Sequence, residues 1–162
     1  MASRNDRRFP RGTMRGSAQL SFGWGRTAGE LRELSLGGAF VAGVRELDPG
    51  TRLSAWVILP NELAPMRIPA RVLYARKGSS FSAGGVGIEF ERVCDDERQR
   101  IARSVERSNL LYTALLFRLQ NPTSRREEVE RACLEAGVPL GLTLPEVEER
   151  VSDALRRYRG ER

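Results

Sequence analysis

The stretch that decides the fold of the first half of the chain is the hexamer Glu33-Leu34-Ser35-Leu36-Gly37-Gly38. It lies at the end of one strand-like segment and forms the connection to the next. On both sides of it, short segments rich in Val, Ile, Leu and aromatic residues alternate with Gly, Pro, Asn and Asp, from Gly16 to about Arg92. This alternation is typical of antiparallel strands joined by tight turns. It predicts strands near residues 18–24, 28–34, 39–44, 52–59, 66–76 and 85–91.

The connections between these segments favour a closed barrel over a parallel sheet. Parallel strands need long crossovers, which are usually helical, and the sequence shows no helical segment between residues 16 and 92. One connection, Asp48-Pro49-Gly50, is a strong turn signal. We therefore expect a six-stranded antiparallel β-barrel over residues 16–94, in a protein that is mainly β with α.

The character of the sequence changes after Cys94, where helical signals replace strand signals. The run Asp95-Asp96-Glu97 places negative charge where the N-terminus of a helix favours it. Apolar side chains then recur at steps of four and three, in a stripe interrupted by one serine: Ile101, Val105, Ser108, Tyr112, Leu115 and Leu119. Asn121-Pro122 ends this helix.

Two shorter helices are predicted after the long one. Ser124 and Glu127 have the spacing of a capping box, as do Thr143 and Glu146, and Gly137 suits the C-terminal cap between them. We therefore divide the chain into three parts. These are a flexible basic arm that contributes to ligand binding (1–15), the barrel (16–94) and a C-terminal helical extension of about three helices (95–162).

The composition narrows the class of protein. The 162 residues are 40% hydrophobic and 30% charged, and no run approaches the roughly 18 apolar residues of a membrane span. The start of the chain lacks the apolar core of a secretory signal, so we expect a cytoplasmic protein without a membrane span. There is no histidine, and Cys94 and Cys133 lack metal-ligand spacing. We expect no zinc site, no histidine base and no cofactor.

Positive charge is concentrated at the N-terminus. The net charge is +6, and residues 1–15 contain five arginines and one aspartate. A basic arm suits a polyanionic partner such as a nucleotide, a nucleic acid or an anionic membrane surface. The chain has one lysine, Lys77, and is rich in arginine throughout, so the spacing of two arginines indicates little by itself.

The arm and the hexamer together resemble the ligand motif of the PilZ domain family. Members of that family carry R-x-x-x-R in an N-terminal arm and [D/N]-x-S-x-x-G on the barrel. Arg7 and Arg11 match the first pattern here, and Ser35 and Gly38 match most of the second. Glu33 stands where the family has Asp or Asn.

The segment Gly85-Val86-Gly87-Ile88-Glu89-Phe90 also resembles the last barrel strand of the family, so the resemblance runs from residue 6 to about residue 100. It implies a bacterial receptor for the second messenger cyclic di-GMP. In such a site, arginines stack on guanine or bind O6/N7 and phosphate, a carboxylate accepts the N1 and N2 hydrogens, and glycine lets the backbone approach the ligand. The implied ligand-binding residues are Arg7, Arg8, Arg11, Glu33, Ser35, Gly37 and Gly38.

On this interpretation the protein is a cyclic di-GMP receptor and adaptor that couples ligand binding to an unidentified protein effector. It is not expected to be an enzyme, because G-x-S-x-G, P-loop and H-E-x-x-H motifs are missing from the sequence. The apolar stripe after residue 95 is longer than one short barrel can cover, which predicts a homodimer formed through the C-terminal helices.

Two alternatives stay open. The chain can be a PilZ-like adaptor that has lost cyclic di-GMP binding, or a barrel of the OB type that binds nucleic acid with its basic arm. The nucleic-acid alternative is less favoured because Phe22, Trp24 and Trp56 fall among apolar neighbours and are expected in the core.

Overall fold

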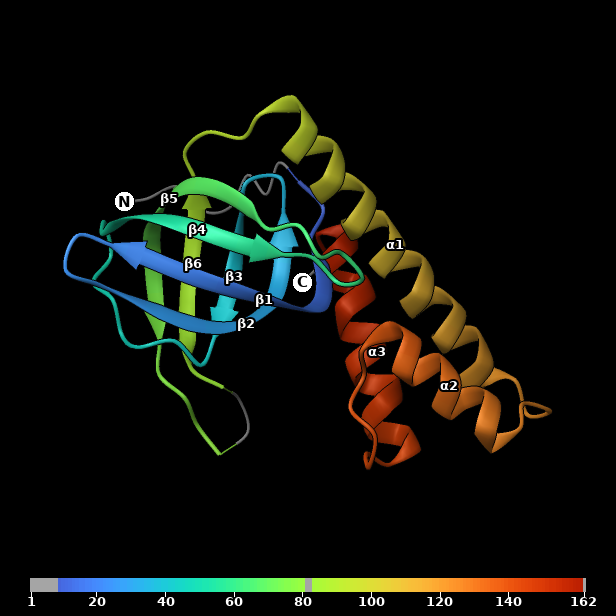
Figure 1. The fold of residues 1–162 in the computed structure, drawn as a ribbon. Coiled ribbons are helices and arrows are strands. Elements are labelled where there is room, and N and C mark those ends of the chain that lie inside the picture. The colour runs from blue at the N-terminus through green and yellow to red at the C-terminus, as the bar shows by residue number, and fades with distance from the viewer. Residues whose placement is uncertain (1–8, 81–82, 162) are drawn as a thin grey trace.

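The computed structural model describes residues 9–80 and 83–161, and the N-terminal half of the protein is a closed antiparallel β-barrel (Figure 1). The strands follow one another around the barrel in the order β1-β2-β3-β6-β5-β4, and β4 closes the sheet by pairing with β1. Their bounds are β1 Gly12–Phe22, β2 Gly25–Ser35, β3 Gly38–Ala42, β4 Arg52–Ile58, β5 Met66–Arg76 and β6 Gly85–Phe90. The predicted six-stranded barrel followed by helices is confirmed.

The outward face of the barrel carries aromatic side chains that we expected inside it. Phe22 is buried, but Trp24, in the turn between β1 and β2, is 70% exposed, and Trp56 of β4 is 40% exposed. Trp56 lies between Ala55 and Val57, which both point into the barrel. Because neighbours along a strand face opposite sides of the sheet, Trp56 must point outward. The expected core position is therefore wrong for both tryptophans.

Strand β1 begins at Gly12, inside the segment 1–15 for which the sequence predicts a flexible arm. Thr13 pairs with Glu33 of β2, so the start of β1 is held beside the beginning of the hexamer. Residues 1–8 lie outside the described residues, and the mobility of the arm stays a prediction.

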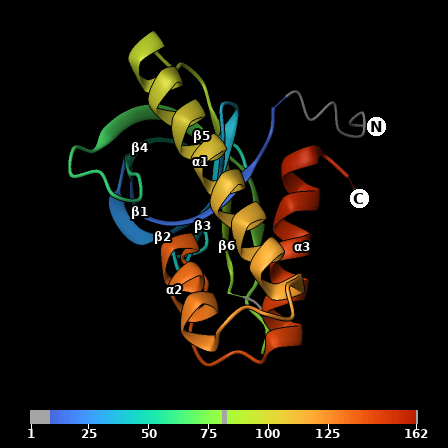
Figure 2. The ribbon, with the colours of Figure 1, turned by 90° about the vertical axis from the view of Figure 1, so that its right-hand side faces the viewer.

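Helix α1 (Asp95–Gln120) belongs to two hydrophobic cores. Its first half contributes Ile101 and Val105 to the core of the barrel. Its second half contributes Tyr112 and Leu115 to a core shared with the two later helices. Figure 2 shows α1 crossing in front of the barrel, with α2 and α3 on either side of its second half.

Ser108 lies between these two halves and explains the interruption of the apolar stripe. It is buried, and its hydroxyl donates a hydrogen bond to the backbone carbonyl of Thr13 in β1. A buried backbone acceptor without a partner is costly, so a serine at this position stabilises the junction of helix and strand better than an apolar residue would.

The C-terminal helices are α2 (Arg126–Ala136) and α3 (Leu144–Arg159). The start of α3 agrees with the predicted capping box, because the amide of Thr143 donates to Oε2 of Glu146 over 2.7 Å. This hydrogen bond and that from the Thr143 hydroxyl lower the pKa of the Glu146 carboxyl. Within residues 9–80 and 83–161, no helix is long and apolar enough to cross a membrane.

The start of α2 differs from the prediction by one residue. The amide of Arg125, not that of Ser124, is capped, and it donates to Oε2 of Glu128 over 3.2 Å. Ser124 belongs to the preceding turn, where its amide donates to the carbonyl of Asn121 over 3.1 Å. The expected pairing of Ser124 with Glu127 is therefore wrong. Because Ser124 belongs to the turn after α1, helix α2 begins one residue later than predicted.

The double role of α1 leads to a stability prediction. Ile101 is fully buried at the end of the barrel, so Ile101→Ala should lower the free energy of unfolding by about 2–5 kcal/mol, through lost apolar contact and the cavity left behind. Leu134→Ala, at an exposed position of α2 (Arg126–Ala136), is the control and should change it by about 0.5 kcal/mol or less. Urea denaturation measures both variants, and equal effects would mean that α1 does not close the barrel.

Candidate functional site

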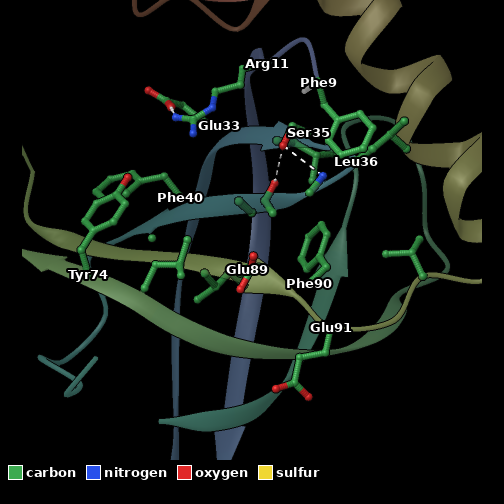
Figure 3. Close-up of a pocket in the computed structure, with 18 of the residues that line it drawn as sticks. Phe9, Arg11, Glu33, Ser35, Leu36, Phe40, Tyr74, Glu89, Phe90 and Glu91 are labelled. Atoms are coloured by element: carbon green, nitrogen blue, oxygen red, sulfur yellow. Dashed lines mark hydrogen bonds and ion pairs between the residues drawn. The ribbon is translucent and has the colours of Figure 1, made fainter. Parts of the chain in front are cut away.

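A surface hollow of about 560 Å³ lies where the chain enters β1, around the β2–β3 turn and against the outer face of β5 and β6 (Figure 3). Most of the residues that the sequence assigns to the ligand site line it: Arg11, Glu33, Ser35, Gly37 and Gly38. The other two, Arg7 and Arg8, lie outside the described residues. The structure therefore brings together parts of the motif that are far apart in the sequence.

The β2–β3 turn is shaped by the hydroxyl of Ser35. Ser35 Oγ accepts a hydrogen bond from the amide of Gly37 and donates one to the carbonyl of Gly38, both over 3.3 Å (Figure 3). The side chain is buried. Ser35 thus fixes the turn that forms one wall of the hollow, and its oxygen keeps one acceptor position that these two bonds leave unused.

Gly38 is required by the barrel. A Cβ atom added to Gly38 would lie 2.1 Å from the carbonyl oxygen of Ile88 in β6, which is far inside contact distance. We expected this glycine to let a ligand approach the backbone, but the close approach that excludes a side chain is that of β6. Any role of Gly38 toward a ligand is additional to this packing constraint.

Two stacked aromatic rings lie at the edge of the hollow, one buried (Phe40) and one 42% exposed (Tyr74), and the sequence analysis did not indicate them. The rings of Phe40 and Tyr74 are nearly parallel, with centroids 6.3 Å apart and an interplanar angle of 17° (Figure 3). The guanidinium carbon of Arg76 lies 4.1 Å from the centroid of the Phe40 ring. Stacked aromatic and guanidinium planes are suitable surfaces for a nucleobase. The sequence does hold a clue to Phe40. It lies two residues after Gly38 in the same strand, and residues two apart in a strand face the same side of the sheet.

Glu33 is the most constrained charged group in the hollow. Its side chain is only 15% exposed, and its Oε2 lies 3.6 Å from Nη1 of Arg11. Its Oε1 accepts a hydrogen bond from Nη1 of Arg157, which comes from α3. Glu33, at the acceptor position of the motif, is therefore contacted by Arg11 near the start of the described chain and by Arg157 near its end. Arg157 was missed by the sequence analysis because nothing in its local sequence distinguishes it from the other arginines of α3.

The described walls of the hollow carry no excess of positive charge. Arg11 and Arg98 are outnumbered by three carboxylates, those of Glu33, Glu89 and Glu91. An anionic ligand here needs further cations, which the predicted arm or neighbouring arginines can supply.

The comparison with protein families identifies the class of protein. The chain matches the model of the PilZ domain over residues 5–107, which is more than half of its length. It therefore belongs to the PilZ domain family. The match ends within α1, so α2 and α3 lie beyond it. No curated protein matches the chain.

Solved structures share the fold at low sequence identity. The inhibitor of motility MotI/DgrA from Bacillus subtilis has a TM-score of 0.56 and 15% identity, covering 65% of this chain and 52% of MotI. The PilZ domain of YcgR from Escherichia coli, solved with cyclic di-GMP, has a TM-score of 0.51 and 18% identity, covering 63% of this chain and 90% of that domain. This chain thus matches about half the length of MotI.

Proposed function

We propose that this protein is a cyclic di-GMP receptor that acts as an adaptor in the bacterial cytoplasm, by binding rather than by catalysis. The observation that carries the proposal is the convergence of the family's motif residues on one hollow of about 560 Å³, a size that suits a small-molecule site. A PilZ domain of the same fold, that of YcgR, was solved with this ligand. The low identity makes the ligand a proposal for this chain.

The chemistry of the hollow suits a guanine base. Arg11 can bind the O6/N7 edge or a phosphate with its planar guanidinium group, and Glu33 can accept hydrogen bonds from N1 and N2. The ring of Tyr74, which is 42% exposed and stacks with the buried Phe40 ring, offers a flat apolar surface beside these polar groups. Arg7 and Arg8 of the arm would supply the positive charge that the described walls lack.

The first prediction concerns affinity. Arg11→Ala should weaken cyclic di-GMP binding by about 2 kcal/mol, roughly thirtyfold in Kd, because it removes a charge-assisted contact. Arg103→Ala, an exposed arginine of α1 away from the hollow, removes the same charge and should leave Kd unchanged. Isothermal titration of both variants measures the effect, and a Kd for Arg11→Ala equal to that of the control would remove Arg11 from the site.

Variants of Glu33 test the acceptor in the same titration. The shorter carboxylate in Glu33→Asp restores the residue of the family motif and should tighten binding, whereas Glu33→Ala leaves guanine donors without a partner and should weaken it. A parallel titration with a random single-stranded oligonucleotide separates the alternatives. Binding of the oligonucleotide alone would favour a nucleic-acid barrel, and binding of neither would favour an adaptor that has lost its ligand.

The contact between Glu33 and Arg157 offers a way to couple the ligand to the helices. A guanine that uses the Glu33 carboxylate must compete with Arg157, and α3 would then lose one of its attachments to the barrel. A protein effector that contacts the helical extension would detect this change.

The competition gives a further affinity prediction. Arg157→Gln should tighten cyclic di-GMP binding by up to about 1 kcal/mol, or about fivefold, because a partly exposed ion pair no longer has to be broken. The adjacent Arg156→Gln is the matched control, since Arg156 pairs with Asp153 within α3 and should not affect Kd. Weaker binding by Arg157→Gln would show instead that Arg157 contacts the ligand.

We also propose that the protein forms a homodimer, through a different surface from the one first expected. The stripe Ile101, Val105, Tyr112 and Leu115 is buried within the chain by the barrel, α2 and α3. Leu110 and Phe117, two turns apart on the outer face of α1, are 62% and 70% exposed and offer an apolar seam for a second copy.

This seam makes the dimer testable. Phe117→Glu should convert a dimer at micromolar concentration into a monomer, because it places a charge at the centre of an apolar contact. Leu63→Glu, at a fully exposed loop position, adds the same charge and should leave the dimer intact. Light scattering measures the mass of each, and a monomeric unmodified protein would reject the dimer.

A further inference from the structure

A second hollow, of about 650 Å³, lies between the barrel and the C-terminal helices, the two layers seen side by side in Figure 1. Strands β1, β2, β3 and β5 form one wall together with Ser79, Ser80 and Ala83 between β5 and β6, and α1, the α2–α3 loop and α3 form the other. The hollow shares Glu33 and Phe40 with the candidate site. Within the second wall, the α2–α3 loop and α3 lie beyond the part of the chain that matches the PilZ family model.

Arginine side chains from four secondary-structure elements converge on this second hollow. They are Arg15, Arg32, Arg76, Arg150 and Arg157, and the carboxylates among the lining residues are those of Glu33 and Asp153. Both carboxylates already have partners. Glu33 is shared by Arg11 and Arg157, and Asp153 pairs with Arg156, which does not line the hollow.

The positive charge that remains is only partly neutralised. Arg15 and Arg32 share one carboxylate, that of Glu30, over 2.8 and 2.9 Å. Nε of Arg32 is buried and has no hydrogen-bond acceptor within the described part of the protein. Across that same part, Arg76 and Arg150 form no ion pair. Several guanidinium groups thus face one space without enough acceptors.

Tyr112 lies in the wall formed by α1, among these arginines. Arg150, Arg15 and Arg32 line the same hollow as Tyr112. Burial raises the pKa of the Tyr112 hydroxyl, and the positive charges of these three arginines act in the opposite direction. A neutral tyrosine hydroxyl beside arginines can donate a hydrogen bond to an anion.

We propose that this second hollow, referred to here as the arginine pocket, binds a phosphate ester with several negative charges, of the nucleoside polyphosphate class. Arginine is the side chain best suited to phosphate, because its planar fork donates two parallel hydrogen bonds. A single small anion would leave most of the guanidinium groups without a partner. The volume is sufficient for a nucleotide, and Arg76 stacked on Phe40 supplies a planar surface for its base.

The occupant that we propose is a separate nucleoside polyphosphate, and cyclic di-GMP is the competing ligand that the test must distinguish from it. The proposal does not depend on occupancy of the candidate site, because Arg15 and Arg150 do not line that hollow. Substitutions of these two arginines therefore test the arginine pocket alone.

The test uses the full chain, isothermal titration at constant salt, and three probes: guanosine triphosphate, inorganic triphosphate and cyclic di-GMP. The double variant Arg15→Gln/Arg150→Gln is compared with Arg103→Gln/Arg107→Gln, which removes the same charge from exposed positions of α1. We expect saturable binding of guanosine triphosphate that is at least tenfold weaker in the first variant and within twofold of the parent in the second.

The outcomes are distinct. If the Arg15/Arg150 variant loses guanosine triphosphate while its cyclic di-GMP binding is unchanged, the occupant is a separate nucleotide. If the variant loses cyclic di-GMP to the same extent, the pocket belongs to the cyclic di-GMP site and the proposal is overturned. Failure of all three probes to saturate in this pocket, or an equal loss in both double variants, would overturn the proposal. Loss of cyclic di-GMP binding in Arg11→Ala alone bears only on the candidate site.

Discussion

The structure depends on the burial of one continuous helix in two cores. The first half of α1 fills the end of the barrel with Ile101 and Val105, and its second half is the central element of the three-helix core. Because an α-helix is stiff over this length, the barrel and the helical core cannot be placed independently. This constraint sets α3 beside the barrel and brings Arg157 to Glu33. Both hollows have walls that depend on this placement.

Local patterns were sufficient to predict the architecture. The short apolar segments between turn residues predicted the barrel, and the stripe through Ile101 and Leu115 predicted which face of α1 is buried. The capping box at Thr143 placed the start of α3. These features depend on neighbours within a few residues, which a sequence shows directly. The start of α2 was misplaced because two overlapping residue pairs have the same capping spacing.

Tertiary placement decided what the sequence could not predict. Arg11, Glu33 and Ser35 were found because they belong to a sequence motif. Arg157 reaches the same site only through the packing of α3, and no pattern in the sequence around it indicates this contact. The arginine pocket is a similar case, since its side chains come from strands and a helix that are distant in the chain. Trp56 is different. Its exposure follows from the alternation along β4, so the available signal was overlooked.

The carboxylate of Glu33 contacts Arg11 and Arg157, so nearly the whole described chain forms a ring that is closed at this point. This closure consists of side-chain ion pairs, so a ligand that used the carboxylate would open it without breaking a hydrogen bond of the barrel. The helical core would still hold α3 in place, because Val151 and Leu155 belong to the same core as Leu115 of α1. The ring can therefore open at the candidate site while the two ends of the described chain stay together.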